Sequence, residues 1–283
     1  MIGLGGNRLT VCRRGGMSVT QAGRGGMEWL GVRDPIWASP YSAAATAALK
    51  AQFPTQWPTI RDYGFSHPAL VPFINEDPML VCSLIPELGK IRWLVSAGAA
   101  YVDTGYKPSY KTNTECLFNK TEYSGSPFGV RWGGSNVSYP TFGIQGERNT
   151  YGEWWRGRYT GSEYANLNLS LNTEYHLIQV GTSAKFYLTS GTVAKDITTT
   201  SNTYTNSFVS TYNLYVMAKN DNGTNETGAV KVAYLKITED GQLIHHYVPF
   251  VGATRQGMVD AITGEYLPKQ GTGSFTISET PAS

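Results

Sequence analysis

The sequence predicts a mainly β protein whose C-terminal two thirds form an antiparallel two-sheet sandwich. Charged residues make up only 16% of the chain, whereas glycine, threonine, serine, asparagine and tyrosine are abundant, which favours strands and tight turns over helical bundles. From about residue 89 onward, short apolar segments alternate with turn signals at intervals of roughly 8–12 residues. The stretch VAYLKITEDGQLIHHYV, residues 232–248, alternates apolar and polar residues on both sides of an Asp-Gly turn, which is typical of a β-hairpin.

The first 33 residues differ in composition from the rest of the chain. They contain five arginines and one glutamate, a net charge of +4, and the tetrapeptide Arg-Gly-Gly-Met occurs twice, at 14–17 and 24–27. A basic glycine-rich segment cannot bury enough apolar surface to fold alone. It is therefore either a flexible tail or an arm held on an acidic surface of a partner protein, and we favour the arm. Its predicted partner-binding residues are Arg13, Arg14, Met17, Arg24, Met27 and Trp29.

Residues 34–94 are predicted to form an adaptor rich in proline and aromatic residues. Eight of the 14 prolines of the chain fall between residues 28 and 87. The segment Ser42–Gln52 predicts one short helix with Ser42 as its N-cap. Because proline is excluded from helix interiors and central strands, we expect extended segments and turns elsewhere. The adaptor either packs on another surface, wraps over the following domain, or forms a small irregular subdomain.

The third region, residues 95–283, is the predicted β-domain. Parallel sheets require crossover connections, usually helices, between their strands, and this region shows none. We expect the segment after Pro249 to be a ribbon of turns. Four side chains of the last hairpin should be largely buried: Leu235, Ile237, Leu243 and Tyr247. The eleven expected strands lie near residues 94–98, 101–103, 114–119, 128–132, 141–145, 153–159, 175–180, 185–189, 213–219, 230–238 and 242–248.

Several motifs of this region resemble those of a known domain family. They include Ala100–Pro108, Phe128-Gly129, Asn222-Gly223 and an ending formed by Leu243–Pro249 and Gly257–Asp260. Together they resemble the concanavalin A-like, LamG-like jelly-roll domains of bacteriophage and prophage structural proteins, notably of gut Bacteroides, over residues 95–277. The resemblance implies a jelly-roll fold far more than an activity. It departs at His245-His246, where the family has an Arg-Asp pair, so an ion pair built there would be lost.

The sequence lacks the patterns expected of an enzyme. Fold relatives that hydrolyse glycosides carry paired carboxylates on one strand, and no such spacing occurs here. No Gly-x-Ser-x-Gly elbow is present, and adjacent histidines on a strand point to opposite faces. The three cysteines have no close spacing, and Asp103, Asp240 and Asp260 could bind calcium or simply form turns. We therefore predict no catalytic residues, no metal and no cofactor.

Partners and location follow from charge, hydropathy and the resemblance. The net charge of +2 does not indicate nucleic acid, and no stretch of about 18 apolar residues or signal-peptide core is visible. We expect a protein made in the bacterial cytoplasm and released in a virion, where it contacts capsid or tail proteins. Because fibre and decoration proteins are commonly symmetric, we also expect a homo-oligomer.

One aromatic strand suggests a surface contact. In the predicted strand 153–159, Trp154, Arg156 and Arg158 share one face and form a candidate contact with glycan or protein. Two hypotheses therefore stand. The first is a non-enzymatic virion structural protein (capsid decoration, head fibre or tail-associated) that displays a lectin-like domain for attachment to host or glycan. The second is a free carbohydrate-binding module whose front segment is merely a linker.

Overall fold

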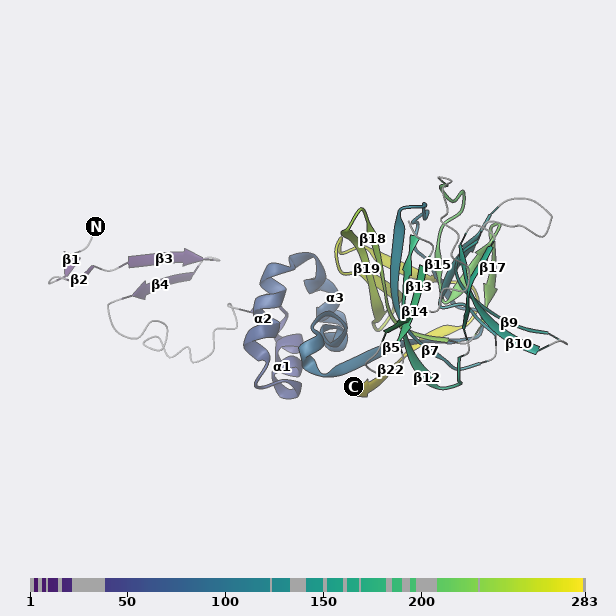
Figure 1. Cartoon of the computed structure of the whole chain (residues 1–283). Coiled ribbons are helices and arrows are strands. Elements are labelled where there is room, and N and C mark those ends of the chain that lie inside the picture. The colour runs from purple at the N-terminus through teal and green to yellow at the C-terminus, as the bar shows by residue number, and fades with distance from the viewer. Residues whose placement is uncertain are drawn as a thin grey trace.

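The fold is mainly β, as predicted, with 49% strand and 21% helix among the residues whose side chains the structure describes. The computed structural model describes residues 39–122, 124–132, 141–149, 152–159, 162–167, 169–181, 185–189, 194–196, 208–228 and 230–281, together with four short strands within residues 1–38. The helices gather in one unit that lies beside a curled sheet (Figure 1). Among the described residues, no helix is long and apolar enough to cross a membrane.

The strands within the arm are short. They are β1 (Gly3–Leu4), β2 (Asn7–Arg8), β3 (Thr10–Arg14) and β4 (Met17–Gln21). β3 and β4 pair antiparallel with Arg14 opposite Met17, so the first Arg-Gly-Gly-Met copy spans the connection between two paired strands. A two-residue connection of this kind is typical of a tight hairpin. The second copy lies outside the described residues.

Residues 39–89 form a helical unit, which corrects the expectation of a single helix among extended segments. The predicted helix is confirmed as α1 (Ala43–Gln52), and Oγ of Ser42 accepts a hydrogen bond from the backbone N–H of Ala45 at 3.2 Å. The further helical elements are α2 (Trp57–Ser66), η3 (Pro68–Leu70), α3 (Val71–Glu76), η4 (Pro78–Leu80), α4 (Val81–Leu84) and η5 (Pro86–Leu88).

Proline starts these elements instead of breaking them. In α2, α3 and all three 3₁₀ turns a proline occupies one of the first two positions, where its missing N–H costs no intrahelical hydrogen bond. Three turns repeat the pattern Pro-x-Leu, and the leucine is buried each time, at Leu70, Leu80 and Leu88. The prolines therefore mark successive starts of short helical elements around a small apolar core.

The sheet begins at β5 (Lys90–Ala97) and curls as its strands follow one another. The order along it is β14-β13-β12-β7-β18-β19-β20-β21-β6-β15-β8-β16-β17, and β5 pairs with β18 and β22, while β9, β10 and β11 form a separate three-stranded sheet. The bounds of its strands are β6 (Tyr101–Asp103), β7 (Thr112–Lys120), β8 (Phe128–Arg131), β9 (Thr141–Asn149), β10 (Gly152–Tyr159), β11 (Ser162–Leu167), β12 (Thr173–Val180), β13 (Lys185–Thr189), β14 (Ala194–Asp196), β15 (Tyr215–Val216), β16 (Ala218–Asp221), β17 (Thr224–Thr227), β18 (Val230–Glu239), β19 (Gln242–Val251), β20 (Gln256–Asp260), β21 (Tyr266–Gln270) and β22 (Ser274–Pro281).

One strand pair is parallel, contrary to the expectation of a purely antiparallel sheet. β15 runs antiparallel to β8, whereas β16 runs parallel to it. Between them Met217 has a φ of 63° and is fully buried, and its N–H donates to the carbonyl of Pro127. The left-handed turn at this residue reverses the chain, so β16 returns along β8 in the parallel direction.

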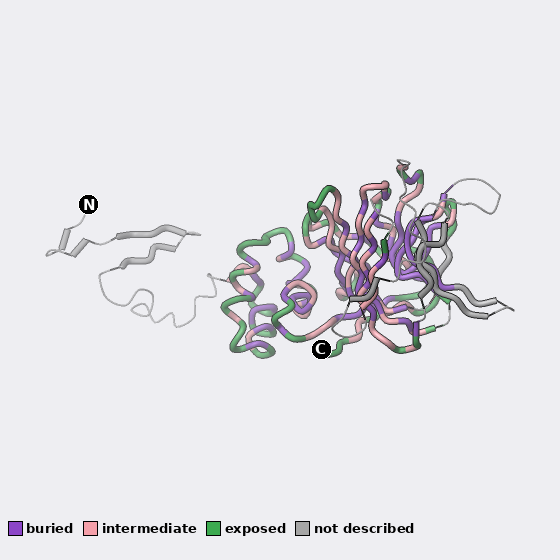
Figure 2. The backbone as a smooth tube through the Cα atoms, viewed as in Figure 1, coloured by how far each residue is buried: buried purple, intermediate pink, exposed green. Residues whose placement is uncertain are grey.

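Among the described residues, two main apolar cores and a smaller cluster of Trp93, Leu117 and Ala233 hold the molecule together. Buried residues run through both the strands and the inner sides of the helices (Figure 2). The main core lies inside the curled sheet and includes Phe118, Phe128 and Leu235. The second is shared between the two units, because helical residues such as Phe73 pack with Phe250 and others from β19 and β20. The helical unit and the sheet are therefore joined by a common core instead of a linker.

The chain from β19 onward departs from expectation in two ways. β19 continues through Pro249 to Val251, because its ladder with β18 ends at Leu235↔Tyr247 and no bond to β18 is required at the proline. The segment expected to be turns forms β20, β21 and β22, and β22 pairs along the whole of β5. β20 is buried at four of its five positions, and a strand that packs on both faces need not alternate, so its pattern escapes detection.

Leu235, Ile237 and Tyr247 are buried as predicted, but Leu243 is 38% exposed. The register between β18 and β19 shifts after Ile237, which faces His245, while Thr238 faces Leu243. This bulge inserts one extra residue, Ile244, which packs against the main core in place of Leu243.

Candidate functional site

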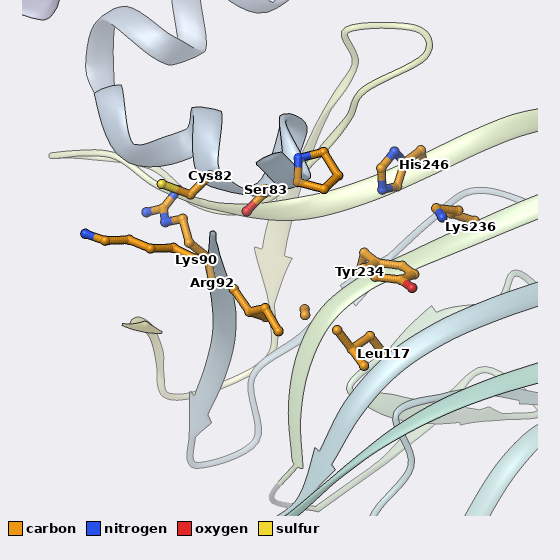
Figure 3. A pocket seen from close by; sticks show the side chains of 11 residues that line it. Cys82, Ser83, Lys90, Arg92, Leu117, Tyr234, Lys236 and His246 are labelled. Atoms are coloured by element: carbon orange, nitrogen blue, oxygen red, sulfur yellow. The ribbon is translucent and has the colours of Figure 1, made fainter. Parts of the chain in front are cut away.

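A cavity of about 300 Å³ lies at the junction of the helical unit and the sheet. Each neighbouring element contributes side chains: α4 and η5 from above, β5 at one side, and β7, β18 and β19 from the sheet (Figure 3). Its apolar walls are Pro86, Ile91, Leu117, Ala233 and Tyr234. Its polar groups are Cys82, Ser83, Lys90, Arg92, Lys236 and His246.

One side of the cavity carries a buried guanidinium. Nη2 of Arg92 donates to Oδ2 of Asp77 at 2.8 Å, and the side chain of Arg92 is only 3% exposed. Its Nη1, and Oγ of Ser83, are buried without a hydrogen-bond partner among the described residues. Lys90 lies on the same strand, and its Nζ is 3.6 Å from Oε2 of Glu279. Surrounding protein atoms enclose Nη1 of Arg92 and Oγ of Ser83, which therefore do not face the open space of the cavity.

The neighbouring thiol is unreactive. Burial raises the pKa of Cys82 to about 11, and the carboxylate of Glu279 adds to the effect against the opposing charge of Arg92. A thiol with this pKa stays protonated near neutral pH, and the thiolate is the nucleophilic form. Cys82 is therefore part of the wall of the cavity and not a nucleophile.

The opposite side of the cavity borders a network centred on Glu115. Its Oε1 accepts hydrogen bonds from the hydroxyl of Tyr234 at 2.8 Å and from Nζ of Lys236 at 2.9 Å, and Nε2 of His176 lies 3.1 Å away. The hydrogen bond from His176, with those from Lys236 and Tyr234, lowers the pKa of Glu115 to about 2. The carboxylate therefore stays ionised and anchors Lys236.

His246 completes this side as a neutral imidazole. Burial, with the nearby positive charge of Lys236, lowers its pKa to about 4. Among the groups that line the cavity, neither Cys82 nor His246 is suited to proton transfer at neutral pH, because a general acid or base works best with a pKa near the working pH. The arrangement is suited to binding and not to acid–base chemistry.

The adjacent histidine has a structural partner. Nδ1 of His245 lies 2.8 Å from Oδ2 of Asp260, which also accepts from Oγ1 of Thr263 at 2.9 Å. Oδ1 of Asp260 accepts from the backbone N–H groups of His246 and Ile262, both at 3.0 Å. Burial works against ionisation of Asp260, but these bonds outweigh it and lower its pKa. Through these contacts Asp260 ties β19 to the end of β20 and to the turn that follows it.

None of the predicted partner-binding or glycan-binding residues lines this cavity within the described part of the chain. Arg13, Arg14 and Met17 lie in or at the ends of the paired strands β3 and β4, and Arg24, Met27 and Trp29 lie outside the described residues. The structure does not describe the side chains of these residues. Their role in partner binding stays a prediction.

The aromatic strand is confirmed as β10, the central strand of its three-stranded sheet. Position 154 is opposite Glu147, position 156 is opposite Gln145, and position 158 is opposite Gly143. The strand conformation on which the candidate face of Trp154, Arg156 and Arg158 depends is therefore present, whereas their side chains lie outside the description. In the described residues no three metal-ligating side chains come together.

The sequence reasoning missed the cavity because its residues come from six elements that are far apart in the chain. One local signal was available: Lys90 and Arg92 are alternate residues of a strand, so both cations lie on one face. Comparison of the chain with known protein families gave no match, and neither did its comparison with curated proteins.

Proposed function

We propose that the chain is a non-enzymatic structural protein of a bacteriophage virion, anchored by its N-terminal region and displaying a lectin-like β-domain. The observation that carries the proposal is the core shared by the helical unit and the sheet. It joins the helical unit of residues 39–89 and the sheet in one body, and the basic, glycine-rich arm of the sequence precedes it. Such a body with such an arm is suited to attachment in an assembly, with capsid or tail proteins as partners and further copies of the chain around it.

The details of the shared core support a rigid anchor. The rings of Phe73 and Phe250 meet edge to face at 5.4 Å. The guanidinium of Arg255 lies about 5 Å from three rings, those of Phe73, Phe250 and Tyr266, and also pairs with Glu76 of α3. Aromatic and cation–π contacts of this kind resist relative movement of two units. A load on the helical unit would therefore be passed directly to the displayed sheet.

We infer that the curled sheet is a two-layer jelly roll. Strands β12, β7 and β18 supply Leu177, Phe118 and Leu235 to the main core. Strands β6, β8 and β15, which follow after the β20–β21 hairpin, supply Val102, Phe128 and Val216 to the same core. Two stretches of one sheet that face a common core are what a jelly roll requires.

Deletion of residues 1–33 tests the anchoring role. The truncated protein should remain folded, because the described residues of the two main apolar cores all follow the deleted segment, and it should no longer join virions assembled in its presence. A matched variant that keeps the length but replaces Arg13, Arg14 and Arg24 by glutamate should fail in the same way. Incorporation of the truncated protein at full occupancy would show that the arm is only a tail and that residues 34–94 do the anchoring.

Glycan attachment is a second role, supported by the strand β10. Alternate positions of a strand share a face, so Trp154, Arg156 and Arg158 form one candidate surface. Replacing Trp154 by alanine should abolish binding to host glycans on an array, whereas the same change at Leu243 should not. The shared core argues against a free carbohydrate-binding module with a front linker, because residues 39–89 are part of the folded body.

A further inference from the structure

We propose that a groove on the helical unit binds the basic arm, residues 1–33, of a second copy of the chain. The groove has a volume of about 440 Å³, and its residues come from α2 with the adjoining His67 and from the segment 84–87, where α4 ends and η5 begins. The inference rests on the proposed anchoring role of the arm, for which it names a partner. It depends on the carboxylates of the groove, its apolar surface and the composition of the arm.

The carboxylates of the groove are available to a partner. Asp62 and Glu87 line it, and no lysine or arginine of the described residues does. Glu87 is exposed and forms no ion pair within the described part of the chain. Asp62 accepts hydrogen bonds from Arg61 through Oδ1 alone, and its side chain is 66% exposed. An exposed ion pair of this kind contributes little to stability, so Asp62 can also accept from an incoming guanidinium.

The negative charge of the helical unit is concentrated in this groove. Residues 39–89 contain two basic and four acidic residues, and therefore carry a net charge of −2. Two of the acids, Glu76 and Asp77, form ion pairs with arginines that follow the helical unit in the chain. The other two acids are those that line the groove, so the acids that the fold does not use to join the two units lie together on its surface.

The groove also offers an apolar surface. Leu84, Ile85 and Pro86 line it from the second segment, and Tyr63 lines it from α2. The ring of Tyr63 stacks on that of His67 with centroids 4.1 Å apart, and Nδ1 of His67 lies 3.0 Å from the carbonyl oxygen of Tyr63. These contacts fix the orientation of both rings. The groove can therefore take up an apolar side chain next to a cationic one.

The arm has the matching composition. It carries a net charge of +4 and repeats the tetrapeptide Arg-Gly-Gly-Met, so each copy of the motif supplies one cation and one apolar side chain. A guanidinium binds carboxylates through charge-assisted hydrogen bonds, and methionine adapts to irregular apolar surfaces. Among the described residues, the strands of the arm pair only with one another. An arm in the groove of the next copy gives a head-to-tail contact, which repeats through an assembly.

A fluorescently labelled peptide of residues 1–33, titrated with the full chain, tests the groove by anisotropy. We expect one peptide to bind per chain, and a peptide with glutamine at all five arginine positions not to bind. Glu87→Gln should weaken binding by about two- to fivefold, as for an exposed ion pair, and Asp62→Asn should add a similar factor. Glu122→Gln, the same change at an exposed site outside the groove, should leave binding unchanged.

Sedimentation velocity of the full chain tests whether the occupant comes from a second copy. We expect association that increases with protein concentration and weakens as salt is added, because the contact is between exposed charges. Asp62→Asn combined with Glu87→Gln should weaken the association to the same extent as it weakens binding of the peptide. A chain that begins at residue 34 should stay monomeric.

Two results would overturn the inference. Equal peptide affinity of the double variant and the unaltered chain would place the arm elsewhere. A full chain that stays monomeric at every concentration would show that no second copy takes up its arm. Neither result touches the anchoring role, which is measured separately by the incorporation of the chain without residues 1–33 into virions.

Discussion

At the scale of single residues, the bulge in β19 separates two leucines that the sequence treats as equivalent. Leu235 is fully buried, whereas Leu243 is 38% exposed. Leu235→Ala should lower the free energy of unfolding by about 2–5 kcal/mol, because it leaves a cavity in a packed core. Leu243→Ala should change it by about 0.5 kcal/mol or less, as surface substitutions do. Urea denaturation of both variants checks this, and equal losses would contradict the bulge.

The half-buried His246 predicts a pH dependence of stability. Its pKa in the folded chain is lowered from 6.5 to about 4, so the unfolded chain binds a proton more readily than the folded chain between these values. The contribution of His246 to the free energy of unfolding is therefore fully present above about pH 6.5. It is lost as the pH falls toward 4, and the loss is at most about 3 kcal/mol. His246→Asn should flatten this part of the curve of melting temperature against pH. An unchanged slope in the variant would show that His246 is solvated.

At the scale of elements, the positions of proline predict that two substitutions in two helices change the free energy of unfolding by very different amounts. Pro78 begins η4, where no intrahelical N–H bond is lost, so Pro78→Ala should change the free energy of unfolding by less than about 1 kcal/mol. Ala47 is exposed in the middle of α1, and Ala47→Pro should cost about 3 kcal/mol or more. Thermal unfolding of the two variants measures this. A large loss in Pro78→Ala would refute the assigned role of proline.

These elements also show what the sequence could predict. α1 was predictable because Ser42 caps it and Pro54 follows it, and the β18–β19 hairpin because one face of it is solvated. The short helices between residues 57 and 88 were not predictable, because composition does not distinguish a proline at a first helical position from a proline in a turn. After Pro249, β20 was missed because it is buried on both faces, and β22 because its partner β5 is distant in sequence. The cavity could not be predicted, since it needs six elements in contact.

At the scale of the whole molecule, the shared core predicts that the helical unit cannot be removed without damage. A chain that begins at Lys90 would expose Val248, Phe250 and Val259, which the helices cover, and would leave Arg92 without Asp77. Removing one member of a buried ion pair is costly, and exposed apolar patches promote association. We therefore expect this truncated chain to aggregate or to melt well below the full chain in differential scanning calorimetry.

A chain that begins at residue 34 serves as the control and should melt in one transition at the temperature of the full chain. If instead the chain from Lys90 is monomeric and equally stable, residues 39–89 are a detachable adaptor, and the cavity at the junction would be a loose contact and not a built site.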